Sequence, residues 1–251
     1  MGSKIWLWAL GVGLACAVAG VVIFRPQGPV QPQPAPASAP VAQAPVLPVE
    51  PKPAAPPAPL TLEQAEDLIR AKSAQLGAHA KLIEWLKSED FIRRFVSAVD
   101  AVAVGKSPRK GLSFWRPKKK FAAMTKDDGP YLDPRTYARY NLAAAAFQSV
   151  DAQAAASILK ELKPVFQQAY EELGYQHSNF EDTLIRAMQE LLKTPVVKGP
   201  IPLKEKVISY SMADEKLEDL SPAQKHLLRM GPKNTAAIQA KLREILKAMG
   251  S

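Results

Sequence analysis

The sequence predicts a mainly α-helical protein with an N-terminal transmembrane helix, a proline-rich linker, and a compact multi-helix domain that carries a small β-hairpin. Three observations support this. Residues 5–24 form a run of twenty residues without a charge. Thirteen of the 23 prolines lie in residues 26–59. Over residues 60–251, apolar residues recur at the 3.6-residue period of amphipathic helices. The expected parts are therefore an anchor over residues 1–25, a disordered linker and a helical domain.

The apolar run has the length of a membrane span. At a rise of about 1.5 Å per residue, a helix over residues 5–24 would cover roughly 30 Å, the thickness of bilayer hydrocarbon. A cleaved signal peptide is the alternative, because Ala17 to Ala19 resemble a cleavage site, but the run continues through Phe24 and favours an uncleaved anchor. Lys4 and Arg25 flank the run, so the charges specify its orientation weakly. We expect the commoner arrangement, with the domain outside the cytoplasm.

The linker is expected to be a stiff spacer without packed structure. Proline fixes φ and cannot donate a backbone hydrogen bond, so residues 26–59 favour extended polyproline II. At about 3.1 Å per residue, this segment would reach roughly 100 Å. The single cysteine, Cys16, lies in the apolar run, so the domain beyond the linker contains no disulfide bond.

The first part of the domain carries two helix starts. Thr61 with Gln64 is a capping-box pattern. Ser88, followed by two acidic residues, predicts the N-cap of a helix that ends near Gly105. The apolar face of that helix consists of Phe91, Ile92, Phe95, Val96, Val99 and Val102.

A basic segment follows this helix. Lys106–Lys126 contains eight Lys or Arg and no acidic residue, which accounts for most of the net charge of +9. Pro108, Gly111 and Pro117 exclude a long helix here. The segment therefore presents its charges from irregular structure.

A hairpin and a further helix come next. Phe121 to Met124 and Tyr131 to Leu132 flank the turn signal Asp128-Gly129 and predict a small β-hairpin. Asp133-Pro134 then combines an N-cap with a first-turn proline, which predicts a helix that continues to Phe147.

The longest predicted helix follows. Asp151 is its N-cap, Pro164 is expected to kink it, and Gly174 is expected to end it. Ser178 with Glu181 is a second capping-box pattern and predicts the next helix.

The last part of the chain contains one predicted strand and two predicted helices. Val207 to Tyr210 favours a short strand. Ser221-Pro222 predicts an N-cap with a first-turn proline. Gly231-Pro232 ends that helix and starts the final one, so the domain is expected to contain about seven helices.

Several separated motifs carry a family resemblance. They are Phe91 to Val96, Leu132 to Pro134 with Tyr137 to Tyr140, Leu162 to Pro164, Glu172 to Tyr175, and Leu220 to Lys225 with Leu228 to Pro232. Over roughly residues 88–248 the chain resembles the bacterial domain-of-unknown-function family numbered 3014, whose members are uncharacterised membrane-anchored proteins. The resemblance implies a membrane anchor, a proline-rich spacer and a helical domain in Gram-negative bacteria. With the orientation expected for the anchor, the protein would be a single-pass protein of the bacterial inner membrane with a periplasmic domain. It implies no activity, so no catalytic residue is carried over.

The sequence contains no pattern typical of a metal, cofactor or nucleophile site. His79, His177 and His226 lack partners at metal-ligand spacing, and we expect them at the surface or at helix ends. Leu228–Lys233 resembles part of a helix-hairpin-helix DNA-binding motif, but Arg229 replaces the first glycine. A tight corner between two core helices is the preferred interpretation, and we predict no catalytic, cofactor-binding or metal-binding residue.

The basic segment is the best candidate for a binding surface. Its candidate residues are Lys106, Arg109, Lys110, Trp115, Arg116, Lys118, Lys119 and Lys120. Three interpretations compete: a solvated loop, a patch for an anionic polymer or lipid headgroup, and a loop that docks a protein. Trp115 is expected to be available for interfacial contact.

The function expected from these observations is a binding or scaffolding module of the cell envelope. Its membrane contact is the integral anchor, and its further partners are envelope proteins or anionic polymers or lipids. A cell-envelope hydrolase with an unrecognised site is one alternative. A membrane-tethered nucleic-acid-binding module is the other, and nucleic acid is the less expected partner.

Overall fold

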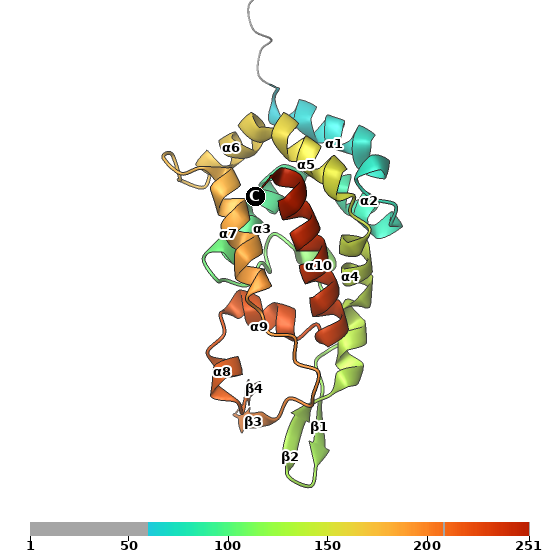
Figure 1. Ribbon diagram of the computed structural model, residues 1–251, viewed down its shortest axis with the longest axis vertical. Coiled ribbons are helices and arrows are strands. Elements are labelled where there is room, and N and C mark those ends of the chain that lie inside the picture. The colour runs from blue at the N-terminus through green and yellow to red at the C-terminus, as the bar shows by residue number, and fades with distance from the viewer. Residues whose placement is uncertain (1–59, 208, 251) are drawn as a thin grey trace, which may run out of the picture. The chain divides into compact units, whose positions relative to one another are not determined.

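The computed structural model describes residues 60–207 and 209–250, which are mainly helical and include two small antiparallel hairpins (Figure 1). The predicted transmembrane helix and the linker lie outside the described residues. Among those residues, no helix combines the length and the apolar character that crossing a bilayer requires. In chain order the elements are α1 (Leu62–Leu76), α2 (Ala80–Leu86), α3 (Phe91–Ala103), η1 (Ser113–Trp115), β1 (Ala123–Lys126), β2 (Gly129–Leu132), η2 (Pro134–Tyr140), α4 (Asn141–Gln148), α5 (Ala152–Glu161), α6 (Lys163–Glu171), α7 (Phe180–Leu192), β3 (Leu203–Lys206), β4 (Ser209–Met212), α8 (Glu215–Glu218), α9 (Pro222–Leu228) and α10 (Pro232–Met249).

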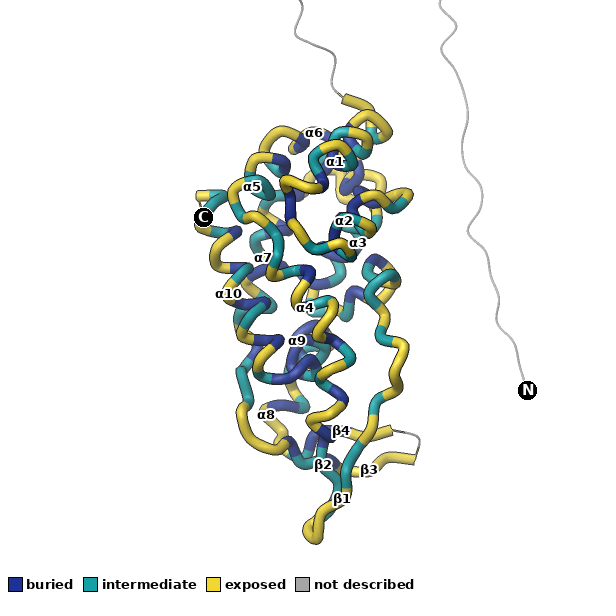
Figure 2. Tube along the Cα trace, turned by 90° about the vertical axis from the view of Figure 1, so that its right-hand side faces the viewer, coloured by how far each residue is buried: buried dark blue, intermediate teal, exposed yellow. Residues whose placement is uncertain are grey.

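The main core lies between the longer helices. Helix α3 packs against α6 and α7, and α10 packs against α4, α5 and α7. Ile92 and Val96 on α3 are fully buried, as the apolar face predicted for this helix requires. Figure 2 shows the buried residues gathered between these helices, whereas the chain that leads into β1 is mostly exposed.

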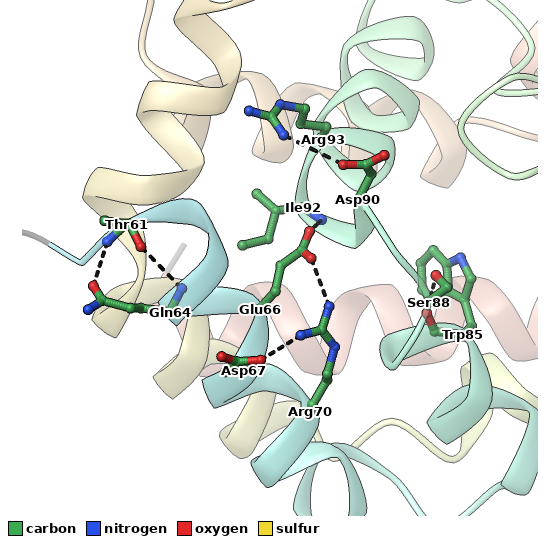
Figure 3. Close-up of polar contacts among 10 residues, drawn as sticks. All are labelled: Thr61, Gln64, Glu66, Asp67, Arg70, Trp85, Ser88, Asp90, Ile92 and Arg93. Carbon is green, nitrogen blue, oxygen red and sulfur yellow. Dashed lines mark hydrogen bonds and ion pairs between the residues drawn. The ribbon is translucent and has the colours of Figure 1, made fainter.

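The start of α3 differs from the prediction. Ser88 is not its N-cap, because the Ser88 hydroxyl donates to the carbonyl of Trp85 at 2.6 Å. Asp90 occupies the cap position at φ 51° and its side chain accepts no capping bond. Glu66 of α1 accepts from the backbone N–H of Ile92 at 3.3 Å instead (Figure 3). A neighbouring helix thus satisfies a donor that the local sequence leaves open.

Two details of the next helices also correct the prediction. Pro164 does not kink one long helix: the chain breaks at Leu162, which is fully buried, and Pro164 lies in the first turn of α6. A first-turn proline fits there because its missing N–H needs no partner. Asn179, rather than Ser178, caps α7 by accepting from the N–H of Glu181 at 2.8 Å.

A second, smaller core lies under the hairpins. The predicted hairpin is confirmed as β1 and β2, and the turn is Asp127-Asp128, directly before Gly129. A second hairpin, β3 with β4, was predicted only as one strand over Val207 to Tyr210. The N–H of Leu132 donates to the carbonyl of Ile201 at 2.9 Å and joins the two hairpin regions. The buried members of this core are Leu132, Ile201, Leu203, Met212, Leu217 and Leu228.

Several predicted caps are confirmed. Thr61 and Ser221 both form complete capping boxes. Gly231 has a φ of 85°, and a Cβ there would lie 2.4 Å from Cγ of Tyr137. The corner between α9 and α10 is therefore packed against η2, as the corner interpretation of Gly231-Pro232 requires.

Candidate functional site

The basic segment starts where α3 meets α9. Gly105 turns the chain at a φ of 72°, and its carbonyl accepts from the N–H of Ala223 at 3.0 Å. Gly111 then presses the segment onto α3, since a Cβ there would lie 2.5 Å from the carbonyl oxygen of Arg94. These two glycines explain how an irregular segment is held in place beside the helices.

The cations of the basic segment are exposed and uncompensated. All eight Lys and Arg from Lys106 to Lys126 are exposed. Eleven ion pairs join the described residues, and none of them includes one of these eight cations. Because these cations lie outside the ion pairs of the described residues, the segment presents a concentrated positive charge at the surface.

Trp115 connects the basic segment to the main core. Its ring lies 5.8 Å from the ring of Trp85 and 5.1 Å from that of Phe114, in edge-to-face geometry. It packs against the main core. Phe114 in turn has the ammonium of Lys81 4.9 Å above its ring. Trp115 therefore anchors the segment to the helices while remaining partly exposed, and its interfacial contact stays a prediction.

Arg139, at the end of η2, faces the basic segment. Its guanidinium donates to the hydroxyl of Tyr140 at 3.0 Å and to the carbonyl of Lys119 at 3.5 Å. It also lies over the rings of Phe121 and Tyr140, at 5.8 and 4.7 Å. Among the described residues, its buried Nε has no hydrogen-bond partner. A buried donor without a partner is costly, and the protein covers this atom.

His226 of α9 lies beside the same arginine. Its Nδ1 is 3.1 Å from the hydroxyl oxygen of Ser107, and its ring is 6.1 Å from that of Tyr140. Burial, together with the positive charges of Arg109, Arg229 and Arg139, lowers the pKa of His226 to about 4. The imidazole is therefore neutral at pH 7.

Arg229 completes the group at the C-cap of α9. Burial lowers the pKa of Arg229, and the charges of Arg109 and Arg139 act in the same direction. Arg109, Arg139 and Arg229 form what we call the arginine cluster. In the part of the chain that the structure describes, none of these three arginines forms an ion pair with a carboxylate.

A cavity of about 1310 Å³ connects these groups. The arginine cluster, Arg116 and Lys119 line it. Most of the remaining wall consists of apolar side chains from both cores. Of the eight residues proposed from the sequence, Arg109, Trp115, Arg116 and Lys119 line the cavity. Lys106, Lys110, Lys118 and Lys120 lie outside it.

The donor set of this site suits anions. Guanidinium groups donate up to five hydrogen bonds, accept none, and match the geometry of carboxylate and phosphate oxygens. Within residues 60–207 and 209–250, no group of three or more His, Cys, Asp or Glu is arranged to hold a metal ion. The arrangement therefore supports binding and orientation of an anion.

Sequence reasoning missed four residues of this site: Arg139, Tyr140, His226 and Arg229. His226 lies in the last turn of α9, which confirms the helix-end position expected for it, and the structure adds that it is half-buried against the basic segment. Arg139, Tyr140 and Arg229 do lie in motifs that carry the family resemblance, which was the available signal. Their convergence could not be read, because they belong to segments far apart in the sequence.

The fold and the site define a mainly helical domain with a cationic cavity. Residues 91–246 match the family described as "Protein of unknown function (DUF3014)", which confirms the resemblance seen in the sequence. The chain belongs to this family. No curated protein and no solved structure matches the chain.

Proposed function

We propose that this protein is a binding or scaffolding module of the bacterial cell envelope that engages anionic surfaces through the basic segment, Lys106–Lys126. The observation that carries the proposal is the set of eight exposed cations, none of which forms an ion pair within the described residues. The proposal places the domain in the periplasm on an inner-membrane anchor. The uncharged run over residues 5–24 supports that placement.

The expected affinity follows from the charge count. Near an anionic surface, each cation contributes up to about 1 kcal/mol, and the contribution fades beyond a Debye length of roughly 8 Å. All eight cations engaged at once would provide at most about 8 kcal/mol, so micromolar binding is the upper limit of the expected affinity. Such binding needs no specific pocket and falls as salt rises.

Nucleic-acid binding through Leu228–Lys233, the stretch that resembles a helix-hairpin-helix motif, receives less support. In such a motif, backbone N–H groups at the glycine turn approach a phosphate. Gly231 is buried here, its N–H donates to the carbonyl of Leu228 at 3.0 Å, and it packs against Tyr137. The corner is thus occupied by the protein itself, and an anionic surface is the better partner for the basic segment.

Vesicle binding by residues 60–251 tests the proposal. A cooperative helical melt of this fragment by circular dichroism comes first and shows that it folds. We expect it to sediment with phosphatidylglycerol vesicles at low salt, to be released as salt rises, and to ignore phosphatidylcholine vesicles. Replacing Lys110, Lys118 and Lys120 by Gln should weaken binding several-fold and leave the melting temperature nearly unchanged, since these lysines form no ion pair among the described residues.

A matched variant controls for net charge. Lys87, Lys160 and Lys247 are also exposed, lie outside the basic segment and form no ion pair within the described part of the chain. Their triple Gln variant loses the same charge and should bind nearly as well as the wild type. Equal binding by both triple variants would show that the basic segment is a solvated face, and the proposal would be wrong.

A further inference from the structure

The cavity beside the arginine cluster has two kinds of wall. One part is apolar and is built from α3, α4, α7 and α10, with Phe95, Phe147, Leu184 and Ile245 among its residues. The other part is cationic and comes from the basic segment, η2 and the end of α9. Both parts line one continuous space of about 1310 Å³. A ligand that fills this space would meet hydrocarbon on one side and guanidinium groups on the other.

The cationic part carries a net positive charge, which Glu205 in the wall and Glu218 near Arg229 offset only in part. The arginine cluster converges from three separate segments, and Glu205 is the acidic residue in the cavity wall. No ion pair of the described residues joins Glu205 to Arg109, Arg139 or Arg229. The buried Nε of Arg139 has no acceptor among the described residues. The protein itself covers this atom, so a ligand in the cavity would be held by the other nitrogens of the arginines that line it.

We propose that this cavity binds a single anionic amphiphile, an acyl chain that ends in a carboxylate or a phosphate. The headgroup lies at Arg109, Arg139 and Arg229, and the chain extends along the apolar wall. A small free anion would leave the apolar wall uncovered, and a neutral lipid would leave the guanidinium groups without a negative charge to pair with. Small-molecule sites usually have volumes of about 300–1000 Å³, so this cavity has room for a chain and its headgroup.

This site goes beyond the surface binding proposed above and can fail independently of it. Lys110, Lys118 and Lys120 do not line the cavity. Their triple Gln variant should therefore weaken vesicle binding several-fold and keep the amphiphile. The double variant Arg139→Gln with Arg229→Gln changes residues outside the basic segment, so it should keep vesicle binding and bind the amphiphile less.

Photo-crosslinking of the full chain in an uncharged detergent tests the proposal. The probes are a diazirine-bearing fatty acid and a diazirine-bearing lysophosphatidic acid, and a diazirine-bearing monoacylglycerol is the uncharged match. We expect the two anionic probes to label residues of the apolar wall, such as Phe95, Phe147 and Leu184, when adducts are mapped by mass spectrometry. Each hydrogen bond to a charged group raises affinity roughly tenfold. The yield of monoacylglycerol adducts at these positions should therefore be lower than that of the anionic probes by about tenfold or more.

Two variants keep the experiment decisive. Arg139→Gln with Arg229→Gln should lower labelling about tenfold or more. Arg109→Gln alone should lower it several-fold, and this exposed side chain makes no hydrogen bond or ion pair among the described residues that folding would miss. Arg243→Gln, at another exposed position, is the matched control and should label like the wild type.

Four results would overturn the proposal. Adducts confined to residues 5–24 would place the probe on the anchor. Equal labelling of the cavity by the monoacylglycerol would remove the role of charge. Wild-type labelling of Arg109→Gln and of the Arg139/Arg229 variant would remove the role of the cluster. The site would belong to a small anion if millimolar inorganic phosphate displaced both anionic probes and no adduct were found on the apolar wall.

Discussion

Lowering the pH from 7 to 5 should destabilise the folded domain through His226. The imidazole is half-buried, lies 3.1 Å from the Ser107 hydroxyl oxygen, and is surrounded by the arginine cluster. Burial and these three positive charges lower its pKa from 6.5 to about 4 in the folded state. In the unfolded chain the ring regains solvent and its ordinary pKa.

The sign and size of the effect follow from this difference. Between pH 6.5 and pH 4 the unfolded state binds a proton that the folded state does not, so stability falls as the pH falls through this window. At 1.36 kcal/mol per unit, the cost is roughly 2 kcal/mol at pH 5 and roughly 3 kcal/mol below pH 4. For a domain of this size, about 2 kcal/mol corresponds to a drop in melting temperature of roughly 4–8 °C.

Urea unfolding of residues 60–251 at pH 7 and pH 5 measures the effect. Carboxylates also titrate on this path, so the informative quantity is the difference between the wild type and His226→Gln. The variant should lose roughly 2 kcal/mol less stability between the two pH values. His177→Gln, at an exposed position, should behave like the wild type. If His226→Gln and the wild type lose the same stability, His226 is not held neutral by its surroundings and the reasoning is refuted.

Two further predictions concern the helix corner and the membrane topology. Gly231→Ala should cost roughly 3 kcal/mol in urea unfolding, because a Cβ would strain a φ of 85° and lie 2.4 Å from Cγ of Tyr137. Gly174→Ala, with a φ of 99° and open space around it, should cost about 1 kcal/mol, and equal costs would contradict the packing argument. Alkaline phosphatase fused after Ser251 should be active, since we propose a periplasmic domain, and an inactive cytoplasmic reporter would exclude that orientation.

Local features of the domain could be predicted because their causes lie within a few residues. The capping boxes at Thr61 and Ser221 each join residues three positions apart. The β1–β2 hairpin needs only a turn signal between two short apolar stretches. Gly105 and Gly231 adopt positive φ where the sequence predicted helix ends. In each case the backbone conformation is decided by side chains that the sequence places next to it.

Other features depend on residues that are distant in the sequence. Glu66 supplies the hydrogen bond at the start of α3 from 26 residues away, and no local pattern could indicate it. Pro164 was predicted to kink one long helix, but the chain breaks between α5 and α6 at Leu162, which is buried in the main core. The contact of Trp115 with Trp85, thirty residues earlier in the chain, also could not be predicted from the local sequence.

The sequence by itself determined that Lys106–Lys126 carries eight cations and no acid. Only the tertiary structure decided that Arg139 and Arg229 join Arg109 around His226. Packing of η2 against the corner between α9 and α10 brings these residues together, with Gly231 seated on Tyr137. The physical reason is that charge composition is a sum over residues, whereas a binding site is a set of positions that long-range packing fixes in space.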